Sequence, residues 1–177
     1  TPLQIQSLIS VYQNDNETIE PQNALITGYD FLIDQASAVA SELDARGVDD
    51  QTTLIDPTWK GSDFRASLLQ ATSYDLISLN SHFDHHLFYP NGSPTEANNL
   101  VFADELDGIA TDFAGSLIFS VGCQSGLNVS DRWYDPTEPS LGADWAQMFA
   151  SRGAAFVGNT GFGYGDVDLL AYSERLM

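Results

Sequence analysis

The chain has 177 residues, 43% of them hydrophobic, and its 25 acidic residues against six basic ones give a net charge of −19. This length and composition predict one folded domain with a substantial core. The charge argues against binding to nucleic acid or to an anionic membrane, and no apolar run is long enough to span a bilayer. A single cysteine excludes an internal disulfide. We expect an acidic, secreted or cell-surface protein, with a halophilic or calcium-loaded protein as the alternative.

Short apolar runs alternate with segments of helical spacing along the chain. We interpret residues 1–23 as a preceding strand, Leu8–Tyr12, followed by an acidic loop. Strands are then predicted at residues 24–27, 52–55, 76–79, 117–121 and 154–158, with an edge strand or hairpin arm at 99–104. Helices are predicted at residues 37–46, 63–70, 105–113 and 141–152, and from residue 166 onward. This alternation predicts an α/β domain with a mostly parallel sheet.

Two of the predicted strands end in residues that can do chemistry. Cys123 follows the run at 117–121, and His82 follows the run at 76–79. If these strands are parallel neighbours, their carboxyl ends lie side by side, where open α/β sheets place their sites. A lone cysteine near a histidine is the pattern of a thiol nucleophile and its base. The alternative for Cys123 is a small buried thiol.

The three histidines offer a different interpretation. His82, His85 and His86 lie within five positions of one another and flank Asp84, so a metal site is conceivable. The Asp-His-His sequence is similar to the motif that names a family of metal-dependent phosphoesterases, but their further aspartate motifs are absent from this sequence. The alternative function is thus a metal-dependent hydrolase that uses residues 82–86, with His85 and His86 otherwise placed in a loop. We expect no cofactor and no metal, with a structural calcium ion as the alternative.

A family resemblance supports the thiol interpretation. A strand that ends in Ser-His and a later strand that ends in Gly-Cys resemble the caspase-like cysteine peptidases. Residues 140–166, SLGADWAQMFASRGAAFVGNTGFGYGD, resemble the gingipain segment that follows the catalytic cysteine. The likeness covers residues 24–177, which we expect to be a gingipain-like peptidase domain, truncated at its C-terminus and part of a larger polypeptide. It implies a caspase-like three-layer α/β/α sandwich and a cysteine endopeptidase that acts on polypeptide substrates.

The resemblance assigns roles to particular residues. Cys123 becomes the nucleophile and His82 the general base and acid. The backbone N–H groups of Cys123 and Phe83 form the oxyanion hole. Phe83 stands where the family usually has glycine, so its side chain must be accommodated. A catalytically inactive caspase-like module that binds partners or serves as a scaffold is therefore the main alternative.

The resemblance also places a substrate pocket in the loops that follow the first strand and the strand after the cysteine. The candidate pocket residues are Tyr29, Asp30, Phe162, Tyr164 and Asp166. A carboxylate in the pocket would pair with a basic side chain, so we expect cleavage after Arg or Lys. The alternative role of these aspartates is helix capping.

Overall fold

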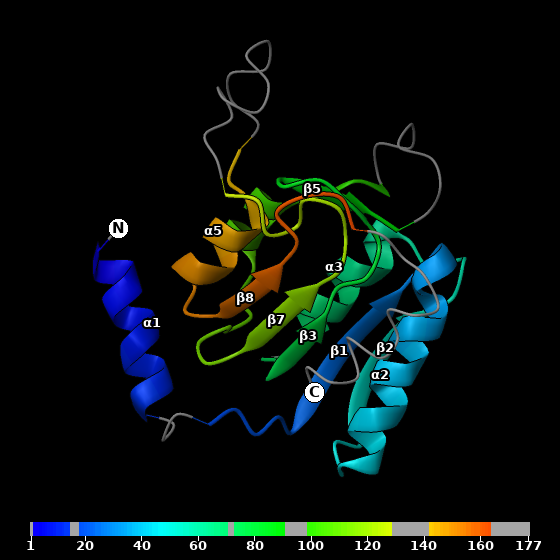
Figure 1. The fold of residues 1–177 in the computed structure, drawn as a ribbon, viewed down its shortest axis with the longest axis horizontal. Coiled ribbons are helices and arrows are strands. Elements are labelled where there is room, and N and C mark those ends of the chain that lie inside the picture. Colours follow the sequence, from blue (N-terminus) through cyan, green and yellow to red (C-terminus); the bar gives the residue numbers. More distant parts are fainter. Residues whose placement is uncertain (1, 15–17, 71–72, 91–98, 129–141, 164–177) are drawn as a thin grey trace.

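The computed structural model describes residues 2–14, 18–70, 73–90, 99–128 and 142–163. Its centre is a five-stranded parallel sheet in the order β2-β1-β3-β7-β8 (Figure 1). These strands are β1 (Asn23–Gly28), β2 (Asp50–Ile55), β3 (Leu76–Ser78), β7 (Leu117–Ser120) and β8 (Ala155–Gly158). The predicted α/β class with a mostly parallel sheet is confirmed.

Both faces of this sheet carry apolar side chains, because successive residues of a strand point to opposite faces. Leu25, Ile77 and Ile118 belong to one buried cluster. Their neighbours along the same strands, Leu76 and Phe119 among them, belong to a second cluster. A short strand that is buried on both faces has the continuous apolar run that made β1, β3 and β7 predictable from sequence.

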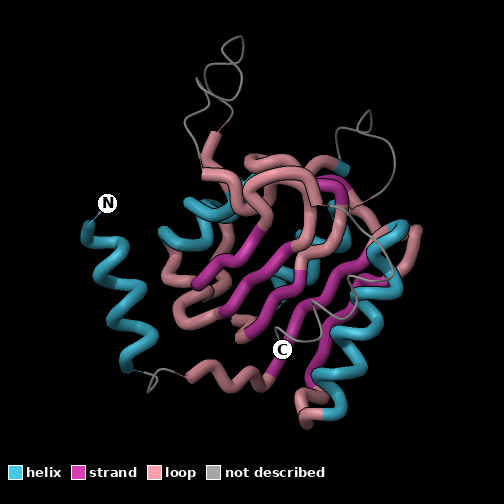
Figure 2. The backbone as a smooth tube through the Cα atoms, viewed as in Figure 1, coloured by secondary structure: helices cyan, strands magenta, loops and turns pink. Residues whose placement is uncertain are grey.

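Helices cover the two faces (Figure 2). Helix α2 (Ile33–Ala45) places Ala36, Val39 and Leu43 in the second cluster. Helices α3 (Gly61–Gln70) and α5 (Trp145–Ser151) contribute Phe64, Leu68, Trp145, Met148 and Phe149 to the first cluster, on the opposite face. The described residues therefore form helical layers on either side of a sheet.

A small antiparallel sheet lies beyond the carboxyl end of β3. Its strands are β4 (His82–Phe83), β5 (Leu87–Tyr89) and β6 (Val101–Phe102), followed by the 3₁₀ helix η3 (Ala103–Gly108). Phe83, Phe88 and Val101 from this sheet join the core cluster that contains Trp145. The small sheet is thus tied to α5 by apolar packing.

Three predictions about local structure were wrong. Residues 2–14 form helix α1 (Pro2–Asn14) and not a strand, because Ile5, Leu8, Ile9 and Tyr12 follow the helical spacing i, i+3, i+4, i+7. The loop expected after His82 contains β5. The helix expected at residues 105–113 is the 3₁₀ helix η3, which begins and ends earlier.

The remaining predictions concern an edge strand, the C-terminal helix and membrane-spanning segments. The edge strand expected at residues 99–104 is confirmed as β6. The helix expected from residue 166 lies outside the described residues. Within the described part of the chain, no helix is long and apolar enough to cross a membrane.

Candidate active site

His82 is held at the carboxyl end of β3 by hydrogen bonds on the residues just before it. The Asn80 amide group donates to Thr27 O at 3.1 Å and to Ser78 Oγ at 2.6 Å, and its backbone N–H donates to Thr27 Oγ1 at 2.9 Å. Ser81 Oγ donates to Tyr89 O at 2.6 Å. These bonds fix the link between β3 and β4 to two neighbouring strands, so the position of His82 is set by the sheet.

Cys123 lies in a tight turn directly after β7. Gln124, the next residue, has a φ of 56°, which is the left-handed region, and its N–H donates to Gly161 O at 2.6 Å. Ser125 Oγ donates to Gly122 O at 3.1 Å, and the Asn159 amide donates to Val121 O at 2.7 Å. The turn that carries the thiol is therefore fixed on its own strand and on the loop after β8.

The two segments meet, as predicted. Strands β3 and β7 are parallel neighbours, with Ser78 opposite Phe119 in the register. The chain remains in contact beyond the strands, since a Cβ atom added to Gly122 would lie 2.5 Å from Phe83 Cδ2. Only glycine fits at this approach. The residues just after His82 and just before Cys123 thus pack directly on each other.

The side chain of Phe83 points into the core. It is 7% exposed and packs on Phe88 and Trp145, with ring centroids 5.0 and 6.1 Å apart. Its bulk is therefore accommodated by the domain core. In the ladder between β4 and β5, Asp84 N–H donates to Leu87 O at 2.8 Å. Because N–H groups of an antiparallel strand alternate in direction, the Phe83 N–H points to the side opposite β5.

Three aromatic rings surround His82. Its ring is stacked on Tyr89 at 5.2 Å between centroids, with Tyr29 and Phe31 edge-on at 5.7 and 6.0 Å. Asp30, between these two, has a φ of 54° and places Oδ2 4.0 Å from His82 Nε2. The structure therefore brings the predicted pocket residues Tyr29 and Asp30 next to His82.

The second predicted pocket loop approaches the cysteine. Cys123 is half-buried, and its Sγ lies 3.7 Å from Gly163 O in the loop that follows β8. Phe162 in that loop is 70% exposed. The other two candidates in this loop, Tyr164 and Asp166, lie outside the described residues.

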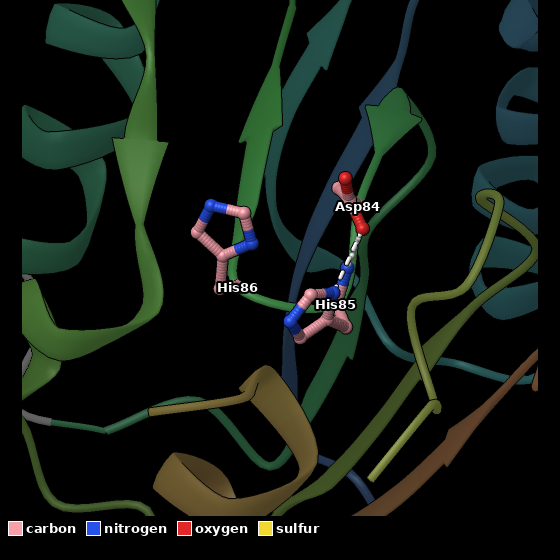
Figure 3. A group of neighbouring side chains, drawn as sticks. All are labelled: Asp84, His85 and His86. Atoms are coloured by element: carbon pink, nitrogen blue, oxygen red, sulfur yellow. Dashed lines mark hydrogen bonds and ion pairs between the residues drawn. The ribbon is translucent and has the colours of Figure 1, made fainter. Parts of the chain in front are cut away.

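His85 and His86 lie in a loop, as predicted, but their burial was not expected. Both are buried, and they form a group with Asp84 in the turn between β4 and β5 (Figure 3). His82 does not belong to this group in the described structure. The sequence therefore places three histidines together, and the fold separates the first from the other two.

Sequence reasoning missed two further residues near these histidines. Tyr89 reaches His82 through the register of β4 on β5, in which the two residues are partners. Asp144, directly before α5, lies 3.7 Å from His85 Nε2 through its Oδ1. No local pattern announces either contact, because both depend on pairing between separate segments.

The geometry gives a thiol and an imidazole at one edge of the sheet, with a carboxylate beside the imidazole and exposed aromatic rings on either side. This set can activate a nucleophile and hold a chain beside it. Comparisons with family models, curated proteins and solved structures found no match to this chain.

Proposed function

We propose that this chain is a cysteine endopeptidase of the caspase-like, gingipain-like type, with Cys123 as nucleophile and His82 as general base and acid. The observation that carries the proposal is the pairing of β3 with β7, which brings the segments after both strands into direct contact. Sites of open α/β sheets lie at this edge. The helical layers on either side of the sheet support the caspase-like three-layer sandwich.

The hydrolysis proceeds through an acyl-enzyme. His82 accepts the proton of Cys123 Sγ, and the thiolate attacks the carbonyl carbon of the scissile peptide bond to give a tetrahedral oxyanion. The oxyanion then collapses to a thioester as the amine leaves with the proton from His82. Water, deprotonated by His82, attacks the thioester, and the acid product and the free thiol are released.

Two features of the structure support these steps. The Phe83 N–H points away from β5, so the β4–β5 ladder does not use it and it can serve with Cys123 N–H as the oxyanion hole. Asp30 lies beside Nε2 of His82, so it favours the tautomer that carries its proton there. In this tautomer Nδ1 has the lone pair that accepts the thiol proton.

A peptide substrate with Arg or Lys at P1 suits this surface. Phe31 and Phe162, 53% and 70% exposed, offer apolar contacts on the histidine side and the cysteine side. Asp30 adds an exposed carboxylate, and the net charge of −19 attracts basic peptides. A guanidinium or ammonium group would thus find both a stacking surface and an anion.

A panel of fluorogenic peptides that differ only at P1 tests the proposal. We expect turnover of the Arg and Lys peptides, with at least a tenfold lower kcat/KM for Asn, Asp and Leu. The Cys123→Ala protein is the control for contaminating peptidases. Turnover confined to Asn, Asp or Leu peptides would contradict the basic preference, and no turnover of any peptide would favour the inactive binding module.

A further inference from the structure

A largely buried group of ionisable side chains lies next to the proposed dyad and has no part in the steps proposed for it. Asp84, His85 and His86 occupy the turn between β4 and β5, with one ligand atom from each within 4.8 Å of the others. His85 is 0% exposed and His86 9% exposed. Figure 3 shows Asp84 joined to the His85 ring by a hydrogen bond, with the His86 ring alongside.

A second carboxylate faces His85 from another part of the chain. Asp144 is buried, and its Oδ1 lies 3.7 Å from His85 Nε2. It occupies the N-cap position of α5. The Trp145 N–H donates to His85 O at 2.9 Å, which holds the two segments together.

His85 thus has a carboxylate at each ring nitrogen. Its Nδ1 lies 2.9 Å from Asp84 Oδ1, while Nε2 faces Asp144. A neutral imidazole has one N–H, so one of its nitrogens would present a lone pair to an anionic oxygen. A metal ion at this nitrogen would balance the charge of the carboxylates beside it.

The position of His86 favours the metal ion. Its ring centroid is 4.7 Å from that of His85, and it brings a further nitrogen donor to the same point. A metal ion held by Asp84 and His85 would gain this nitrogen as a third ligand. A carboxylate on the outer N–H of a metal-bound histidine is the usual second-shell arrangement, and Asp144 is placed to supply it.

We propose that Asp84, His85 and His86 bind one divalent transition-metal ion, with Asp144 orienting His85. Two imidazoles and a carboxylate select Zn²⁺ and its neighbours over Ca²⁺ and Mg²⁺, which prefer oxygen ligands. His85 and His86 are buried and Asp84 is one-third exposed, so we assign the ion a structural role, with its fourth position open to water or a further ligand. It fixes the turn that directly follows His82 and Phe83, and Asp144 connects it to α5.

Metal titration of the full chain, stripped with a chelator, tests the site. The Cys123→Ala background is used so that the thiol cannot bind metal. We expect about one equivalent of Zn²⁺ per chain by elemental analysis, and visible absorption bands of a nitrogen- and oxygen-ligated site with Co²⁺. Saturating Zn²⁺ should raise Tm by roughly 5–10 °C, the size expected at about 100 times Kd.

Two variants and a matched control assign the ligands. His86→Gln should weaken Zn²⁺ binding by a factor of at least about 100, and Asp144→Asn by about 10 to 100, as for other second-shell groups. His82→Gln, a histidine outside the group, should bind Zn²⁺ as the parent does. The proposal would be overturned if the protein bound less than 0.1 equivalent of metal per chain, or if its Tm did not change with Zn²⁺ or chelator. Equal Zn²⁺ affinity in His86→Gln and His82→Gln would also overturn it. If His86→Gln does not fold, the Zn²⁺ affinity of Asp144→Asn is compared with that of His82→Gln in its place, and equal affinities would again overturn the proposal.

Discussion

His82 and His85 are close neighbours in sequence and occupy opposite environments. The His82 side chain is 34% exposed, lies among aromatic rings and faces an exposed carboxylate, whereas His85 is 0% exposed between two carboxylates. The chain passes from one to the other within a single strand and turn, in which Phe83 enters the core. An imidazole that is partly exposed can exchange protons with a substrate, whereas a fully buried one is out of the substrate's reach and acts on the structure around it. The different environments of His82 and His85 are thus set by the fold, since the residue type is the same.

We expect the largest effect at Cys123, the nucleophile of the proposed dyad. Cys123→Ala should lower kcat/KM for peptide hydrolysis by a factor of about 1,000 or more, since no other group can form the thioester. Its stability should change by less than about 1 kcal/mol, because the thiol is only half-buried. Peptide assays with thermal unfolding check both. A variant that keeps a tenth of the activity would rule out Cys123 as the nucleophile.

The two histidines should separate activity from stability. His82→Ala should be about as inactive as Cys123→Ala while its free energy of unfolding stays within about 1 kcal/mol of the parent. His85→Ala should lose about 3 kcal/mol of stability, because it removes a fully buried side chain that lies beside the buried Asp144 carboxylate and the partly exposed Asp84 carboxylate. Denaturant unfolding and kcat/KM, measured at a temperature where both variants are folded, check this.

The comparison fails if the two variants behave alike. If His82→Ala and His85→Ala are both fully folded and lose the same activity, the histidines would form one catalytic cluster, which would favour a metal hydrolase. An unchanged stability in His85→Ala would mean that Asp84 and Asp144 do not depend on the imidazole between them.

The proposed dyad could be predicted from sequence, but its surroundings could not. Cys123 and His82 follow short apolar runs, and parallel pairing of such runs is the common arrangement in α/β domains. The contact of Tyr89 with His82 depends on a three-residue strand that has no periodicity to detect. The contact of Asp144 with His85 joins two segments far apart in the chain and depends on where α5 packs. His85 and His86 lie in a loop as predicted, but polar residues in the core give no hydrophobic signal, so their burial could not be predicted.

A substitution of Asp30 shows whether its carboxylate orients the His82 ring or contacts the P1 side chain of the substrate. Asp30→Asn should lower kcat/KM by a factor of about 10 to 100, because the amide no longer favours the productive imidazole tautomer. Asparagine tolerates the positive φ at this position, so the backbone should be retained. If Asp30 only orients His82, the loss should be the same for every P1 residue, whereas an added contact with the P1 side chain should make it larger for Arg and Lys peptides. Asp34→Asn, in the first turn of α2, is the matched control. A loss confined to Arg and Lys peptides would instead place Asp30 in the P1 pocket.

We expect the smallest of these effects at the half-buried ion pair between Arg65 and Glu105, which lies outside the surroundings of both His82 and His85. Arg65 Nε lies 2.5 Å from Glu105 Oε2, and Arg65 also donates to Glu105 Oε1 at 2.6 Å. Burial raises the pKa of Glu105, but the hydrogen bonds from Arg65 and Phe102 N–H and the guanidinium charge outweigh it, so the pKa is lowered overall. Its contribution to stability is therefore present above the unfolded pKa and is lost as pH falls through the folded pKa.

Glu105→Gln should accordingly lose about 1 kcal/mol of stability at pH 7, a value reduced by solvent screening of a pair that is one-third exposed. Urea unfolding at several pH values measures the difference, which should shrink as the pH falls below about 4. A difference that stays constant down to strongly acidic pH would show that packing, and not charge, is lost.

The most direct test of the dyad is covalent labelling of Cys123 with a peptidyl acyloxymethyl ketone that carries Arg at P1. We expect one adduct per chain, located at Cys123 by peptide mass spectrometry, and a labelling rate at least about 100 times lower in His82→Ala, because the thiolate depends on the imidazole. Labelling of the native protein no faster than that of the urea-unfolded chain, or at an equal rate in His82→Ala, would contradict the account.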